Sequence, residues 1–116
     1  MKPENSKNRN LDSLLIERLS SLGSLSNSTR AGILIVLLAL KKATFTDILT
    51  AVKVSKSSLS TSLSLLEKSG YIRIEHGFLR RGGPRTIIII TNEGEKAIVE
   101  YLDLMGELAK LTSESK

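Results

Sequence analysis

Three arginines surround a glycine-rich turn in the second half of the sequence. Residues 77–91 read GFLRRGGPRTIIIIT, so Arg80, Arg81 and Arg85 flank a Gly-Gly-Pro turn and a run of isoleucines follows it. Guanidinium groups bind phosphate in a forked geometry and favour the negative potential of a DNA minor groove. A turn between two β-prone runs predicts a hairpin, and we expect the isoleucine strand to anchor its basic tip to the core. The alternative interpretation is a solvated turn that is basic by chance.

A serine-rich segment, SKSSLSTSLSLLEKSG at residues 55–70, holds the second set of side chains suited to binding. On a helix, its leucines at 59, 63 and 66 share one face. Small hydroxyl side chains fill the opposite face. That face carries no acid, because Glu67 falls near the apolar edge. Small hydroxyls let a helix approach base edges and can donate to or accept from bases and phosphates. A merely solvated face, the alternative, should hold more Glu and Lys and less Ser. The predicted DNA-binding residues on this helix are Lys56, Ser57, Ser60, Thr61, Ser64 and Lys68.

The composition argues against most catalytic chemistry. The 116 residues include no cysteine and one histidine, His76, which disfavours zinc sites and histidine-based triads. Two Phe, two Tyr and no Trp disfavour single-strand binding by base stacking. We therefore expect no enzymatic activity, no metal and no cofactor. His76 is expected to be solvent-exposed, with a phosphate contact as the alternative.

The positive charge is concentrated in the middle of the chain. Residues 41–86 hold nine Lys or Arg against three acids, a local charge of +6, out of a net charge of +5 for the whole chain. Residues 87–116 hold three basic residues against six acids, a local charge of −3. A basic block of this kind indicates a polyanionic partner, although solubility alone also explains a modest excess.

The apolar pattern predicts a mainly α-helical domain with a small β-hairpin. Apolar residues recur at helical spacing over residues 11–22 and about 92–112, and the run AGILIVLLAL at 31–40 predicts a buried central helix. This run is too short for a bilayer, which needs roughly 20 residues. A short edge strand is expected at ATF. The predicted helix N-caps are Asn27 or Ser28, Thr46, Ser55 and Thr91.

The chain is expected to form one domain. Residues 1–10 are predicted to be a disordered polar tail, and residues 11–116 a single folded unit. The first ten residues lack the apolar stretch of a signal peptide. We therefore expect a cytoplasmic, nucleoid-associated protein.

Residues from about 28 to 112 resemble the winged helix-turn-helix transcriptional regulators of the MarR and ArsR groups, and most of all the small single-domain members found in archaea. The resemblance is carried by SKSSLSTSLSLLEKSGYI and by PRTIIIITNEG, which contains a Thr-x-x-Gly helix start at Thr91 to Gly94. It implies a recognition helix over about 56–69 in the major groove and a wing over about 77–86 on the minor groove or backbone. The chain departs from many members at GGPRT, in lacking the cysteines of ArsR metal sensors and in being shorter than most MarR proteins.

The resemblance also implies that the terminal helices build a homodimer. A single compact core has difficulty covering both of their apolar stripes, which favours a two-fold dimer, although packing on the same domain is the alternative. The predicted interface residues are Leu11, Leu15, Leu19, Ile98, Tyr101, Leu102, Met105 and Leu108.

The function predicted from these features is a dimeric, sequence-specific regulator of transcription that binds double-stranded DNA. Two alternatives stay open: a winged helix that docks proteins in a transcription or chromatin assembly, and a nonspecific architectural DNA binder. Whether the protein senses a small-molecule effector is left open.

Overall fold

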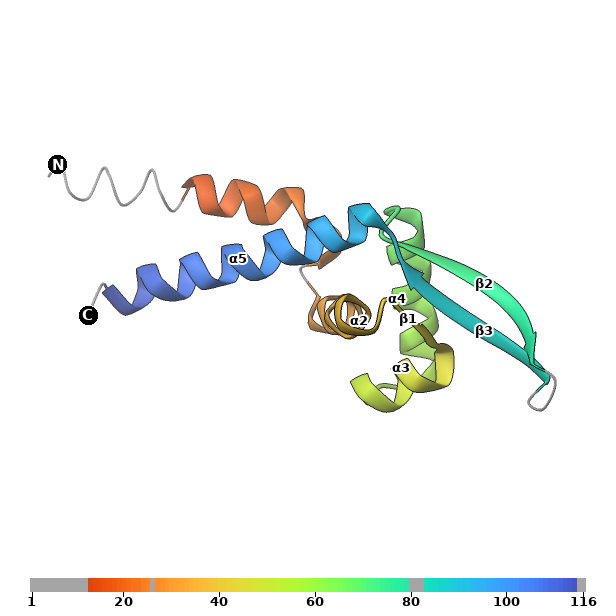
Figure 1. Ribbon diagram of the computed structural model, residues 1–116. Coiled ribbons are helices and arrows are strands. Elements are labelled where there is room, and N and C mark those ends of the chain that lie inside the picture. The colour runs from red at the N-terminus through yellow and green to blue at the C-terminus, as the bar shows by residue number, and fades with distance from the viewer. Residues whose placement is uncertain (1–12, 26, 80–82, 115–116) are drawn as a thin grey trace, which may run out of the picture.

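The computed structural model describes residues 13–25, 27–79 and 83–114. A helix over residues 13–21 comes first, followed by helices, strands and a hairpin in the predicted order (Figure 1). The elements after it are η1 (Gly23–Leu25), α2 (Ser28–Leu40), β1 (Lys42–Thr44), α3 (Phe45–Val52), α4 (Lys56–Lys68), β2 (Ile72–Leu79), β3 (Gly83–Ile90) and α5 (Asn92–Glu114). This order confirms the predicted mainly helical winged helix fold with a β-hairpin wing.

The isoleucine strand lies in the middle of the sheet. The three strands are antiparallel in the order β1-β3-β2, so β3 has a hydrogen-bonded neighbour on each side. Because successive side chains of a strand point to opposite faces, Ile88 and Ile90 are buried in the core while Ile87 and Ile89 lie half-buried on the other face. The prediction that the isoleucine strand anchors the hairpin to the core is therefore confirmed.

Helix α2 forms the centre of the core, as its apolar sequence predicts. Ile33, Leu34 and Leu37 are fully buried, and α2 contacts α3, α4, α5 and the sheet. Ile35 and Leu40 remain exposed on its outer side. Within the described residues, no helix is both long enough and apolar enough to cross a membrane.

Side-chain caps define where α3 and α4 begin. The Ser55 hydroxyl accepts a hydrogen bond from the Ser58 amide at 3.0 Å, which confirms Ser55 as the N-cap of α4. The prediction of Thr46 as the N-cap of α3 is wrong. Strand β1 runs directly into α3, and Thr44 forms a reciprocal capping box with Asp47, so the helix begins two residues earlier.

The start of α5 is pressed against the turn between α4 and β2. The Thr91 hydroxyl donates to the Gly70 carbonyl at 2.7 Å and accepts from the Gly94 amide at 3.0 Å, which confirms Thr91 as the cap. The Thr91 amide also donates to the Tyr71 carbonyl. A Cβ on Gly94 would lie 2.1 Å from that carbonyl oxygen, so this close approach requires glycine. The Thr-x-x-Gly motif thus fixes the base of the wing relative to α5.

The helix over residues 13–21 lies along α5, and the two project from the core at the end opposite the hairpin (Figure 1). Arg18 pairs with Glu100 at 3.8 Å and with Asp103 at 3.7 Å, which links the two helices on their exposed side. The wing and the terminal helices therefore occupy opposite ends of the molecule.

Candidate nucleic-acid interface

Helix α4 presents one polar face to solvent and buries the other. Leu59, Leu63 and Leu66 lie in the core, as their spacing predicts. Ser62 is the one buried polar residue among those described. The six residues of α4 predicted to contact DNA are all exposed: Lys56, Ser57, Ser60, Thr61, Ser64 and Lys68.

An acid, Glu67, lies where the polar face of α4 meets the apolar edge, as its position in the sequence predicts. Glu67 is exposed and lines the same groove as Ser60 and Ser64. Ser64 and Glu67 are four and seven residues after Ser60, so the three side chains lie along one stripe of the helix. Glu67 therefore borders both the serines and the buried leucines. A carboxylate on this stripe repels phosphate at the end of α4.

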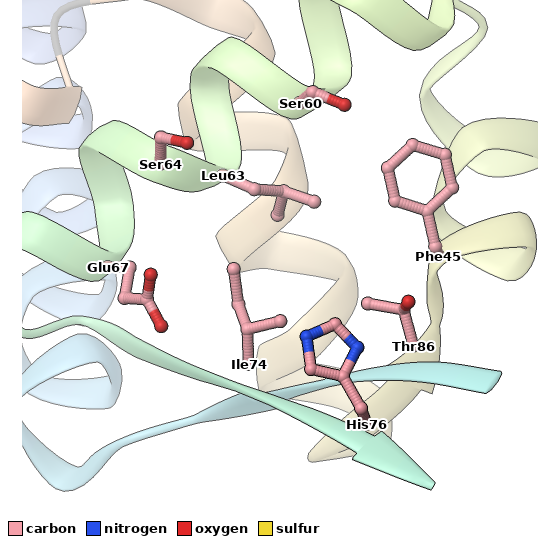
Figure 2. A pocket seen from close by; sticks show the side chains of 8 residues that line it. All are labelled: Phe45, Ser60, Leu63, Ser64, Glu67, Ile74, His76 and Thr86. Atoms are coloured by element: carbon pink, nitrogen blue, oxygen red, sulfur yellow. The ribbon is translucent and has the colours of Figure 1, made fainter. Parts of the chain in front are cut away.

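An open groove of about 400 Å³ separates α4 from the wing. Figure 2 shows its apolar floor, formed by Leu63 from α4, Ile74 from β2 and Phe45 from α3. The polar groups around this floor are the hydroxyls of Ser60, Ser64 and Thr86, the Glu67 carboxylate and the His76 imidazole. The groove therefore joins the predicted recognition helix to the base of the wing.

Two groove residues, His76 and Thr86, were not among the predicted DNA-binding residues, although a phosphate contact was the alternative interpretation for His76. They are directly opposed in the register of β2 and β3. The signal was present in the sequence, since residues 72, 74 and 76 alternate along a strand and therefore share a face. Ile72 is buried and Ile74 lines the groove, so His76 continues their face toward α4. His76 is exposed, as expected.

The three wing arginines are only partly described. Arg80 and Arg81 lie outside the described residues. Arg85 lies on β3 opposite Gly77, and its side chain is half-buried. Its Nε atom is buried, with no hydrogen-bond partner among the described residues. Thr86 and Ile88 face α4 and the core, so alternation places Arg85 on the other face of the sheet, away from the groove.

A second hollow, of about 430 Å³, lies between α2 and α3. Its walls are small apolar and hydroxyl side chains, and none of the residues predicted to bind DNA lines it. The residues are Ser28, Thr29, Gly32, Val36, Ala51, Val52 and Val54.

The residues predicted at a dimer interface divide into four groups. Leu11 lies outside the described residues. Leu15 and Ile98 are buried in the core of the single chain, where α5 also contacts α2. Leu102 is exposed. The half-buried residues packed against the core are Leu19, Tyr101, Met105 and Leu108.

The sequence matches a family model described as a winged helix DNA-binding domain over residues 29–109, and the chain belongs to this family. No curated protein matches it in sequence.

Solved structures with the same fold include regulators from archaea and bacteria. A transcriptional regulator homologue from Pyrococcus horikoshii is 27% identical, with a TM-score of 0.72 over 81% of this chain and 95% of that chain. YusO from Bacillus subtilis is 18% identical, with a TM-score of 0.68 over 97% and 85%. ZitR, a zinc-responsive MarR family member from Lactococcus lactis, is 18% identical, with a TM-score of 0.57 over 76% and 59%. The expected likeness to MarR regulators, including an archaeal one, is confirmed.

Proposed function

We propose that the protein is a transcription regulator that binds specific sites on double-stranded DNA as a homodimer, without enzymatic activity. The observation that carries the proposal is the exposed serine and lysine face of α4, next to a hydroxyl-lined groove at the base of the wing, in a chain of the winged helix DNA-binding family. It would act in the cytoplasm, at the nucleoid.

In the proposed complex, α4 enters the major groove. Small side chains such as Ser57, Thr61 and Ser64 let the helix backbone approach the bases, where hydroxyls can donate or accept. Lys56 and Lys68, at the two ends of α4, are placed to neutralise phosphates on either side of that groove. The wing follows the neighbouring backbone or minor groove with Arg80 and Arg81.

The terminal helices supply the proposed dimer contact. Exposed apolar side chains remain on the helix over residues 13–21, at Leu14 and Ile16, and on α5, at Val99 and Leu102. Burying such side chains against a second copy is favourable by roughly 25 cal/mol for each Å² removed from water. A two-fold dimer sets two recognition helices about 34 Å apart, which fits a palindromic site.

A protein-docking role is the second candidate. A docking version of α4 would need exposed large apolar side chains on its outer face. Leu65 is the exposed large apolar residue of α4, and the rest of that face is serine, threonine, lysine and Glu67. This composition favours DNA over an apolar protein partner.

The proposal is tested by fluorescence anisotropy with the full chain. Binding to a duplex from its own upstream region is compared with binding to a random duplex of equal length, across a salt series. We expect tight binding to the first and weak, salt-steep binding to the second. Equal affinities for both would favour a nonspecific architectural binder, and no binding at low salt would favour protein docking.

A further inference from the structure

The turn from α2 into β1 is made by one residue, Lys41, in an unusual backbone conformation. Lys41 has φ 71° and ψ −41°, and among the described residues the other non-glycine residue with a positive φ is Lys53. Lys53, with φ 54° and ψ 51°, lies in the left-handed region where helices commonly end, whereas Lys41 lies nearer the strained conformation of a γ-turn. Glycine adopts a positive φ without steric cost, so a strained lysine here indicates a function for its side chain.

Lys41 joins three elements. Its amide donates to the Leu37 carbonyl at 2.7 Å, which completes the last turn of α2, and its carbonyl accepts from the Ile90 amide at 3.1 Å, at the end of β3. Its ammonium group pairs at 2.5 Å with the carboxylate of Glu95, in the first turn of α5. A glycine could form both backbone hydrogen bonds but not the ion pair. The ion pair to α5 is therefore what a lysine adds at this position.

The beginning of α5 is held from two sides. On one side, Thr91 and Gly94 lie against the turn between α4 and β2. On the other side, Glu95 is bound to the end of α2. Because α2 and α4 both belong to the winged helix body, these contacts fix the direction in which α5 leaves that body (Figure 1). Val99 and Leu102, the proposed contact with a second copy, lie about one and two turns beyond Glu95.

We propose that the ion pair between Lys41 and Glu95 positions α5 relative to α4, and thereby sets the distance between the two recognition helices of the proposed dimer. Lys41 is a positioning residue in this sense, since it acts through α5 and not on DNA. The backbone hydrogen bonds of Lys41 hold its Cα in place, so the ion pair acts on α5 from a fixed point. This inference rests on the proposed function, because it requires a dimer that binds a palindromic site.

A small change in the direction of α5 is enough to alter that distance. In a two-fold dimer with recognition helices about 34 Å apart, each helix lies about 17 Å from the axis. A tilt of about 10° moves each helix by about 3 Å, so the spacing changes by up to about 6 Å, nearly two base-pair steps of about 3.4 Å. The Lys41 and Glu95 side chains are 64% and 32% exposed, and such pairs contribute little to the free energy of unfolding. The expected effect of breaking the pair is therefore on geometry and not on stability.

The chain allows a direct measurement of this geometry, because it contains no cysteine. Ser58→Cys places a single spin label per copy at an exposed position of α4, outside the six residues proposed to bind DNA. Double electron–electron resonance on the free dimer then measures the distance between the two α4 helices. The variants compared with wild type are Lys41→Gly, Glu95→Gln and the charge exchange Lys41→Glu with Glu95→Lys. Lys42→Gln is the matched control, because it removes the next positive charge in the chain and leaves the ion pair in place.

We expect one narrow distance distribution for wild type and for Lys42→Gln, a shifted or broader one for Lys41→Gly and Glu95→Gln, and recovery in the exchange variant. Both single variants of the pair should also lose roughly tenfold in the preference for the native palindrome over one with two inserted base pairs. Lys41→Gly lowers the net charge and Glu95→Gln raises it, so a loss shared by both cannot come from general attraction to DNA. Affinity for a duplex with a single half-site should stay unchanged.

The outcomes separate this inference from the proposed function. An unchanged distance distribution in Lys41→Gly and Glu95→Gln, or no recovery in the exchange variant, would overturn the positioning role and leave the regulator intact. A lower urea midpoint for Lys41→Gly than for wild type would also overturn it, by showing that the lysine serves stability. Wild-type monomers, or equal wild-type affinity for the upstream and random duplexes, would instead overturn the proposed function itself.

Discussion

At the scale of single residues, Gly94 controls how closely α5 approaches the α4–β2 turn. A Cβ at this position would lie 2.1 Å from the Tyr71 carbonyl oxygen and 2.9 Å from Cγ1 of Ile90. Because the first contact is with backbone, side-chain rotation cannot relieve it. We expect Gly94→Ala to lower the free energy of unfolding by about 3 kcal/mol, as overpacking of a tight interior does. Urea denaturation measures this loss.

The matched control for that substitution lies on the same helix. A Cβ on Gly106 meets no atom within 4 Å, and the residue is exposed. Gly106→Ala should therefore stabilise α5 by about 0.5–1 kcal/mol, because alanine loses less backbone entropy. Equal effects of the two substitutions would show that α5 does not press against the turn as described.

The residue-level chemistry of the interface was partly readable from the sequence. Helical spacing was enough to assign Ser60 and Ser64 to the polar face of α4, since that face depends on local geometry alone. The placement of Glu67 in a groove, and of His76 opposite Thr86, depends on how β2 and β3 align and how the hairpin packs on α4. Tertiary packing of this kind is difficult to predict from a single sequence.

At the scale of elements, the beginning of α3 is set by the capping box of Thr44 and Asp47. We expect Thr44→Ala to destabilise the protein by about 1 kcal/mol, because it leaves the Asp47 amide without its side-chain acceptor. Thr46→Ala is the control, since Thr46 is exposed inside the helix and its change should stay within about 0.5 kcal/mol. Thermal unfolding of the two variants shows which threonine caps the helix. A larger loss of stability for Thr46→Ala than for Thr44→Ala would contradict the observed helix start.

For the terminal helices, the sequence pattern predicted the helices but not the surfaces against which they pack. Leucine stripes on both were visible, and both segments are helical as predicted. The sequence did not show that part of each stripe is covered within the single chain, where Leu15 and Ile98 are core residues. A stripe indicates that something covers it, whereas the identity of the covering surface depends on the three-dimensional path of the chain.

At the scale of the whole molecule, specificity is proposed to come from the middle of α4. We expect Thr61→Ala and Ser64→Ala each to lower the preference for the specific site over random DNA by about 1 kcal/mol, because a lost base contact has no effect on random sequence. Lys56→Gln is the contrasting variant, expected to weaken binding to both duplexes and to reduce the salt slope by about 0.9. Competition anisotropy measures the ratio of the affinities for specific and random DNA for each variant. Equal losses on specific and random DNA for Thr61→Ala and Ser64→Ala would reassign these hydroxyls to the backbone.

Assembly is the property of the whole molecule that joins two such recognition helices. Val99 and Leu102 are exposed apolar residues on α5, and a second copy is proposed to cover them. We expect the double substitution Val99→Glu with Leu102→Glu to yield monomers in sedimentation velocity, because desolvating two carboxylates in an apolar contact is costly. The monomer should retain its helical circular dichroism and its weak affinity for random DNA, while binding to a palindromic site falls at least tenfold.

Leu40→Glu provides the control for that experiment. Leu40 is also an exposed apolar residue, but it lies at the end of α2 and not on a terminal helix. Its substitution should leave both the sedimentation coefficient and palindrome binding unchanged. Dissociation by Leu40→Glu, or wild-type sedimentation of the α5 variant, would move the contact between copies away from α5. In that case the spacing of the two recognition helices could no longer be expected to match one turn of DNA.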